Sequence, residues 1–284
     1  MVGTAMAEDY VDPTVNYDEL LVQRRAAFRS DTAAQVELKQ WYSLPDGQAT
    51  EPFKHLVDTS IKDYKEPVLY QKAHGRGEQS DVVYQDPTGR FVLIVDRASP
   101  VREVAGDKTD ASLVHVLAVP TAKIYNIVDV DGRDCQLLND MAKVTAALFN
   151  QQGFRQKVIR VVYANTVKAM KRKNDMPEHH QAVILGNFFR DLLVFVDTKS
   201  GNDLHFAFHP HPTHSIAQLH MHVLVKGMQT SHKSDALSVP LDAVNRVVCG
   251  ASLGTGMAPP VQDDPTWQSI RHRFIAVPAL ASAA

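Results

Sequence analysis

The stretch Ala217-Gln218-Leu219-His220-Met221-His222-Val223-Leu224-Val225 decides the fold of this chain. Successive side chains of a β-strand point to opposite faces of its sheet. One face of this stretch is apolar and carries Leu219, Met221, Val223 and Val225. The other face carries Gln218, His220 and His222. Because buried imidazole and amide groups need hydrogen-bond partners, we interpret the polar row as facing a ligand and the apolar row as facing a core.

The overall composition indicates an ordinary globular protein. The chain has 284 residues, of which 44% are hydrophobic, enough for a full core. Its formal charge is -2, from 30 basic and 32 acidic residues, so any binding of phosphate must be local rather than a general attraction to nucleic acid or membrane. Cys135 and Cys249 are too few for a disulfide framework and lack a metal-ligand spacing. With no apolar run of spanning length and no signal-like start, we expect an intracellular, cytoplasmic protein without a membrane partner.

Periodicity and turn-forming residues predict the other elements. We expect helices over 18–28, 32–44, 137–148, 178–196 and 241–248, and strands over 82–86, 91–96, 113–119, 158–163 and 204–208. The basic run 168–173 is interpreted as a solvated loop, with contact to a polyanion as the alternative. Gly75 and Gly77 are interpreted as a plain turn, because a strand follows them where a phosphate-binding loop would open a helix.

Histidine is concentrated near the organising strand, where six of the thirteen lie between His205 and His222. The His-x-His spacing also suits zinc or iron, but a third ligand at a typical spacing is missing, so we predict no metal and no other cofactor. We interpret His205 and His209 as structural residues. For His211 and His214 the sequence leaves structural and phosphate-binding roles equally open.

Four motifs in order resemble the histidine triad (HIT) superfamily of nucleotide hydrolases and transferases. They are Val83-Tyr84-Gln85-Asp86, Ile94-Val95-Asp96-Arg97-Ala98-Ser99-Pro100, His115-Val116-Leu117-Ala118-Val119-Pro120 and Ser215-Ile216-Ala217-Gln218-Leu219-His220-Met221-His222-Val223. The resemblance covers residues 81–226 with an insertion at about 154–203. Residues 1–80 would form an N-terminal helical extension, and 227–284 a C-terminal extension. The resemblance implies an α+β fold with a five-stranded antiparallel sheet and flanking helices, and a homodimer.

The resemblance also implies roles for individual residues. It makes His220 the nucleophile and His222 the third histidine of the motif, with Gln218 standing where the superfamily has its first histidine. Ser215 matches a serine that contacts phosphate, and Asp96 an acidic residue that meets the ribose. His115 matches a supporting histidine, with His211 and His214 as further candidate contacts to the substrate. In the superfamily a main-chain carbonyl near the first motif position steadies the nucleophile, so a glutamine there is compatible with the same chemistry.

The chemistry of imidazole agrees with these roles. An imidazole of ordinary pKa, about 6.5, is largely neutral at neutral pH and can attack phosphorus without an added base. His220 would then carry a nucleotidyl group until water or another acceptor takes it. The resemblance implies a reaction at the α-phosphorus of a nucleotide, and we therefore predict a nucleotidyl hydrolase or transferase that acts there on a nucleotide, a nucleotide conjugate or a nucleic-acid end. The alternative is a catalytically weak nucleotide-binding or scaffold protein with a degenerate triad.

Overall fold

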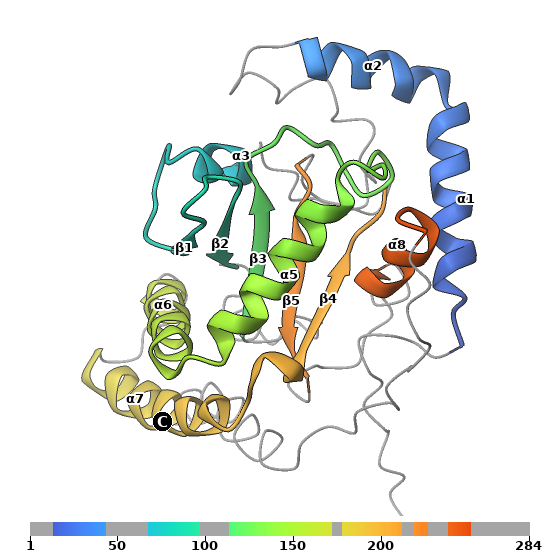
Figure 1. Cartoon of the computed structure of the whole chain (residues 1–284). Helices are drawn as coiled ribbons and strands as arrows, with labels where there is room; N and C mark the ends of the chain where they lie inside the picture. The colour runs from blue at the N-terminus through green and yellow to red at the C-terminus, as the bar shows by residue number, and fades with distance from the viewer. Residues whose placement is uncertain are drawn as a thin grey trace, which may run out of the picture.

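One antiparallel sheet organises the part of the chain that the structure describes, which is residues 14–43, 68–96, 114–171, 178–211, 218–226 and 238–250 of a computed structural model. Its strand order is β1-β2-β3-β5-β4-β6 (Figure 1). The strands are β1 (Val82–Gln85), β2 (Phe91–Val95), β3 (His115–Pro120), β4 (Leu204–Phe208), β5 (Met221–Val225) and β6 (Val239–Pro240). The hairpin of β1 and β2 and the pairing of β3 with β5 place the predicted site strand at the centre of the sheet.

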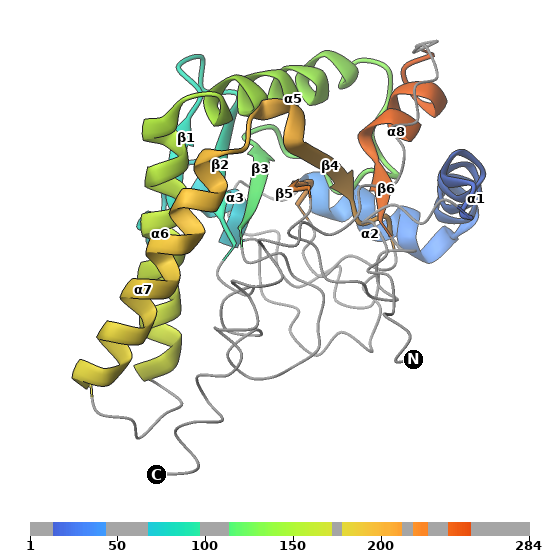
Figure 2. The ribbon, with the colours of Figure 1, turned by 90° about the horizontal axis from the view of Figure 1, so that it is seen from below.

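Most of the helices cover one face and one edge of the sheet, and α3 lies against the other face (Figure 2). They are α1 (Tyr17–Ser30), α2 (Thr32–Ser43), α3 (Val68–Ala73), α5 (Cys135–Phe149), α6 (Gln152–Lys171), α7 (Glu178–Asp197), α8 (Leu241–Val247) and the 3-10 helix η2 (Gly201–Asp203). Helix α5 packs on β3, and α6 packs on β1 and β2. Helix α7 runs back along α6 as a hairpin.

The two faces of the sheet bury different side chains because the strands alternate. Leu93, Val116 and Met221 point into the main core together with Leu138 and Met141 of α5. The opposite face carries a smaller apolar cluster under α3, which comprises Leu69, Ala73, Val92, Ile94, Leu117 and Val119. His222 stands opposite Leu117 in the register of β3 and β5, so His222 lies on this second face, as the alternation predicts.

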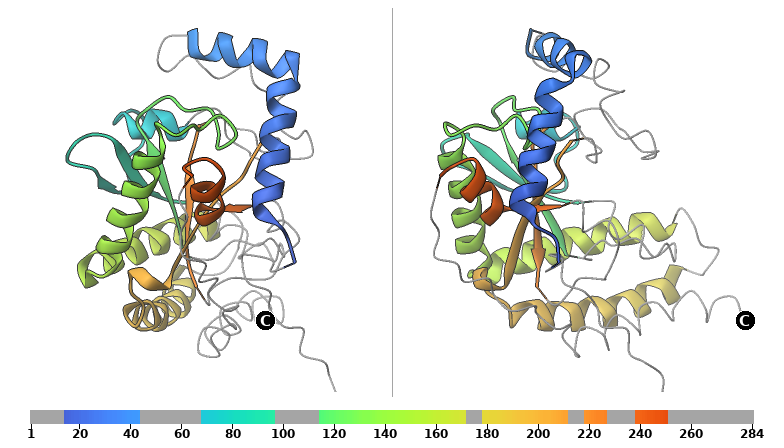
Figure 3. Two further views of the ribbon diagram at one scale, coloured as in Figure 1. Left: turned by 45° about the vertical axis from the view of Figure 1, so that its right-hand side comes forward. Right: turned by 90° about the vertical axis from the view of Figure 1, so that its right-hand side faces the viewer.

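Helices α1 and α8 close the edge of the sheet beside β6 (Figure 3). Asp18 of α1 and Arg246 of α8 form a paired contact with 2.8 Å between Nη2 and Oδ1. Arg25 of α1 is buried and its Nη1 donates to the main-chain oxygen of Val130 at 2.6 Å. Helix α1 of the predicted N-terminal extension and helix α8 after β5 are therefore in contact with each other and with β6. The predicted domain boundaries stay predictions.

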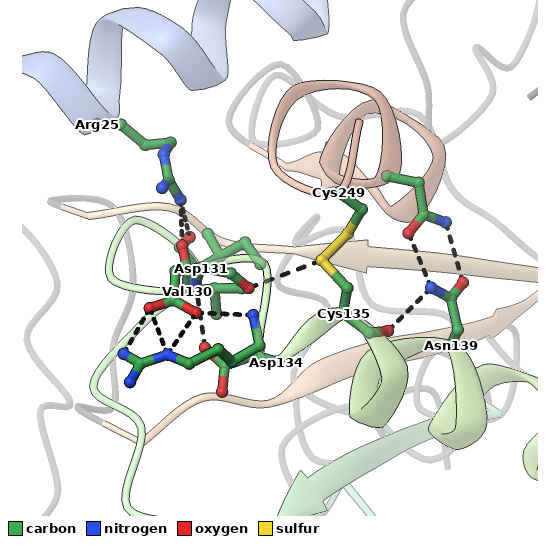
Figure 4. The surroundings of a disulfide bond; sticks show 10 residues. Arg25, Val130, Asp131, Asp134, Cys135, Asn139 and Cys249 are labelled. Atoms are coloured by element: carbon green, nitrogen blue, oxygen red, sulfur yellow. Dashed lines mark hydrogen bonds and ion pairs between the residues drawn. A yellow bond between two sulfur atoms is a disulfide. The ribbon is translucent and has the colours of Figure 1, made fainter. Parts of the chain in front are cut away.

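A disulfide joins the beginning of α5 to the residue that lies two positions after α8 (Figure 4). Cys135 and Cys249 are 114 residues apart in the chain and 5.8 Å apart at their Cα atoms. The side chains of Asn139 and Asn245 exchange two hydrogen bonds of 3.1 Å beside it. Disulfides are rare in the cytosol, so this bond stands in tension with the cytoplasmic expectation, and the compartment stays a prediction.

The region 158–163 is helical, which corrects the predicted strand. Val158, Ile159 and Val162 are buried on one side of α6 against the main core. Their β-branched side chains favour a strand in isolation, but the spacing i, i+1, i+4 also fits a helix, and packing against the sheet decides between the two. The basic run 168–173 is corrected as well, because its residues up to Lys171 continue α6 instead of forming a loop.

Two further expectations differ in detail. Within the described residues the sheet has six strands instead of five, because β6 adds two residues to the edge of β4 through Ala207–Pro240 and Phe208–Val239. The organising strand begins at Met221, so Gln218 and His220 precede it.

Gly75 and Gly77 both have positive φ, near 70°, as turn residues do. Among the described helices, none is long and apolar enough to cross a membrane.

Candidate functional site

His220 is held by a main-chain hydrogen bond from its own motif. Its Nδ1 lies 2.7 Å from the main-chain oxygen of Gln218. A carbonyl oxygen only accepts, so Nδ1 carries the proton and Nε2 keeps its lone pair. The side chain is buried, with 7% of the residue exposed. His220 is thus oriented as a neutral imidazole whose nucleophilic nitrogen is Nε2.

Asp96, His115 and His222 form a second hydrogen-bonded chain across three strands. Asp96 follows β2, His115 begins β3, and His222 lies on β5. The Asp96 carboxylate is 3.1 Å from Nδ1 of His115, and Nε2 of His115 is 2.9 Å from Nδ1 of His222. If the carboxylate accepts from His115, and His115 accepts from His222, then Nε2 of His222 holds a lone pair. That atom is buried and has no hydrogen-bond partner among the described residues.

Burial keeps both motif histidines uncharged. Desolvation is the main cause that lowers the pKa of His220, while its bond to the carbonyl of Gln218 and the charge of Asp96 oppose the shift. Desolvation also lowers the pKa of His222 well below its ordinary value, helped by His209, His220 and His115. A neutral His220 has the lone pair that attack on phosphorus requires. A neutral His222 has a lone pair that can accept a proton.

His209 also belongs to this cluster, although the sequence suggested a structural role. Its ring centroid lies 4.1 Å from that of His222, compared with 4.9 Å between His220 and His222. Asn126 holds this position by donating to the main-chain oxygen of His209 at 3.0 Å. The signal was present in the alternation of β4, because Ala207 pairs with His222 and His209 shares the face of Ala207.

The amide of Gln218 does not join the histidines. Its Nε2 donates to the main-chain oxygens of Pro120 at 3.2 Å and Ala122 at 3.0 Å, and the residue is fully buried. The side chain therefore anchors the motif to the end of β3. What Gln218 offers to His220 is its main-chain carbonyl, which any residue would supply.

His211 lies in a different environment from the cluster. Its Nδ1 is 3.3 Å from the hydroxyl oxygen of Tyr125, and its ring packs on Phe28 of α1 with centroids 5.2 Å apart. Burial lowers the pKa of His211 to about 4. These contacts favour the structural role that the sequence left open. His214 and Ser215 lie outside the described residues.

A metal would need several ligands converging on one point. Among the described residues, no group of three or more His, Cys, Asp and Glu side chains is arranged to hold one. The rings of His115 and His222 are stacked at 22°, and Nε2 of His115 and Nδ1 of His222 are hydrogen-bonded to each other.

Comparison with known families agrees with this geometry at a coarse level. A family described as "Scavenger mRNA decapping enzyme C-term binding" matches residues 68–172. That family has a HIT-like fold, so the match supports the HIT superfamily, an α+β fold and nucleotide hydrolase chemistry in general terms. The matched range includes Asp96 and His115 and ends before Gln218, His220 and His222. No curated protein matches the chain.

Proposed function

We propose that this protein is a HIT-type nucleotidyl hydrolase or transferase that acts at the α-phosphorus of its substrate through a nucleotidyl group on His220. The observation that carries the proposal is the 2.7 Å contact between Nδ1 of His220 and the main-chain oxygen of Gln218. It selects the tautomer with a free Nε2 lone pair, and it does so without a histidine at position 218.

The reaction has two displacements at phosphorus. The Nε2 atom of His220 attacks, an N–P bond forms, and the bond from phosphorus to the leaving group breaks. The leaving group takes a proton, for which His222 is the candidate donor once it is protonated beside the His115–Asp96 pair. Water then attacks the same phosphorus and breaks the N–P bond, while neutral His222 accepts its proton. The product is a nucleoside monophosphate, or a nucleotidyl conjugate when another acceptor replaces water.

Other residues would bind the substrate. Ser215 would donate to a non-bridging phosphate oxygen, His214 would lie beside it, and Asp96 would meet the ribose in addition to orienting His115. His211 is the weakest of these candidates, given its packing on Phe28. Because the matched family is described as a decapping enzyme, a cap dinucleotide belongs among the substrates to test. A homodimer remains part of the proposal, to be tested by sedimentation.

The test is turnover and covalent trapping. Purified protein is incubated with adenosine 5′-phosphoramidate, a dinucleoside polyphosphate and a cap dinucleotide, and monophosphate release is followed. Rapid acid-free quenching with a labelled substrate should trap an acid-labile, alkali-stable nucleotidyl protein. His220→Ala should abolish both signals, and His205→Asn on the neighbouring strand is the matched control that should retain them. Turnover that survives His220→Ala would refute the nucleophile.

One observation favours the second candidate, a catalytically weak nucleotide-binding or scaffold protein. Only 7% of His220 and 6% of His222 are exposed. A phosphate can therefore reach Nε2 of His220 only if the atoms that bury this side chain move aside. Equilibrium binding of the same substrates separates the two. Micromolar binding without turnover or trapped intermediate would establish the second candidate, whereas turnover lost in His220→Ala establishes the first.

A further inference from the structure

A cavity of about 400 Å³ lies away from the histidine cluster, between α1, the turn at 131–132 and the end of α8. Its walls include apolar side chains from Val22 of α1 and from Val247 and Val248 beside α8. None of its lining residues belongs to the Asp96, His115, His209, His220 and His222 cluster. The volume is at the lower end of the range of small-molecule sites, about 300–1,000 Å³.

Two arginines of α1, Arg25 and Arg29, line this cavity together with one carboxylate, Asp131. Arg25 is 9% exposed and spends Nη1 on the main-chain oxygens of Val130 and Ile127 (Figure 4). A guanidinium has five N–H donors, so this leaves others for a ligand. The guanidinium of Arg29, in the last turn of α1, makes no hydrogen bond or ion pair within the described part of the chain. Burial is the largest cause that lowers the pKa of Arg25, and the nearby positive charge of Arg29 is the second.

The carboxylate in the wall is already committed. Asp131 receives Nε and Nη2 of Arg133, with 2.7 Å from Nη2 to Oδ2, and these bonds lower the pKa of Asp131 to about 2. Asp129, the other acidic neighbour of Arg25, accepts the hydroxyl of Tyr42. The cavity therefore combines two guanidinium groups with apolar walls. Guanidinium pairs bind carboxylate and phosphate oxygens strongly because their N–H groups match the spacing of those oxygens.

We propose that this cavity is a binding site for a small organic anion, with one phosphate or carboxylate group against Arg25 and Arg29 and an apolar body against Val22, Val247 and Val248. The site is distinct from the proposed catalytic site and does not depend on it. The disulfide helps to build it, since Cys249 follows Val248 directly and ties that wall to α5.

The experiment uses the full-length oxidised protein and isothermal titration with phenyl phosphate, benzoate and benzyl alcohol. The two anions should bind and the neutral alcohol should not, and the stronger anion names the class of headgroup. Arg29→Gln should weaken binding about tenfold or more, the loss expected for one charged contact. Val22→Trp should also weaken it, because the indole fills the cavity while both arginines remain.

Two controls keep the outcome clear. Arg24→Gln removes a charge of the same helix outside the cavity and should leave the affinity unchanged. His220→Ala should also leave it unchanged, which distinguishes this site from the proposed catalytic site. Three results would overturn the proposal. They are binding that is insensitive to both Arg29→Gln and Val22→Trp, binding that is lost in His220→Ala, and failure of both anions to bind. Arg25 is not substituted, because its bond to Val130 supports the fold.

Discussion

The two faces of the same sheet perform different tasks with alternating residues of the same strands. On the helix-covered face, β5 contributes Met221, Val223 and Val225 to the main core. On the other face, β5 contributes His222, bonded to His115 of β3. The apolar face draws its stability from burial, which is insensitive to the identity of distant groups. The histidine face depends on hydrogen bonds whose donors and acceptors must be matched one by one.

Adjacent substitutions on β5 should separate the two tasks most strongly. His222→Ala is expected to lower turnover by about 10²–10⁴-fold, as for loss of a general acid or base, and to lower the free energy of unfolding by about 1–3 kcal/mol, because buried His115 loses its hydrogen-bond partner. Met221→Ala, one residue earlier, should lower the free energy of unfolding by about 2–5 kcal/mol because it leaves a cavity in the core. Its turnover per folded molecule should be unchanged. The measurements are steady-state kinetics and urea denaturation, and a reversed pattern would contradict the assignment of the faces.

The disulfide belongs to neither face of the sheet, because it joins the beginning of α5 to the segment after α8. Cys249→Ser should lower the free energy of unfolding by about 2–5 kcal/mol, since the bond closes a loop across 114 residues. Denaturation of the oxidised parent, the reduced parent and the variant gives the comparison. The reduced parent should resemble the variant. Equal stability of all three would show that the bond adds nothing.

The hydrogen bonds that link Asp96 to His115 and His115 to His222 should affect the rate of turnover more than stability. Asp96→Asn keeps the shape but removes the charge that orients His115 and favours protonated His222. We expect turnover to fall about tenfold to a hundredfold, with the acidic limb of the pH–rate profile displaced. A matched control is Asp140→Asn, whose carboxylate pairs with Arg90 on the surface. A turnover rate equal to that of the parent would show that the bond from Asp96 to His115 does not contribute to catalysis.

Acid should act on stability through the buried histidines. The folded-state pKa of His211 is depressed to about 4, against about 6.5 when unfolded. Between these values the unfolded chain binds more protons, so stability falls as the pH drops from about 6.5 to 4 and the loss levels off below that. His211→Asn should make the urea midpoint less dependent on pH in this window. An unchanged slope would show that His211 is not buried in its neutral form.

The smallest effect is expected at Gln218. Gln218→His should change turnover less than about threefold, because the main-chain oxygen that holds His220 is retained. Gln218→Leu should instead lower the free energy of unfolding by about 1–3 kcal/mol, since two buried carbonyls lose their donor. Kinetics and denaturation measure the two. An increase of several orders of magnitude in Gln218→His would show that the natural site is impaired.

Much of the fold follows from local patterns. Alternation and turn residues predicted the β1–β2 hairpin, β3 and β4, and helical spacing predicted α2, α5 and α7. Local patterns failed where two structures suit the same residues, as at Val158 to Val162 in α6. They also missed β6, whose two residues, Val239 and Pro240, are too short for any period to register.

The sequence alone was enough to place His222 on the polar face of an otherwise apolar strand, because strand geometry depends only on neighbours in the chain. Through its resemblance to a known superfamily it also suggested Asp96 and His115. The bonds that link Asp96 to His115 and His115 to His222, the addition of His209, the separate environment of His211 and the Cys135–Cys249 pair required the assembled sheet. Those contacts join residues up to 114 positions apart, and only the packing of whole elements brings such residues within bonding distance.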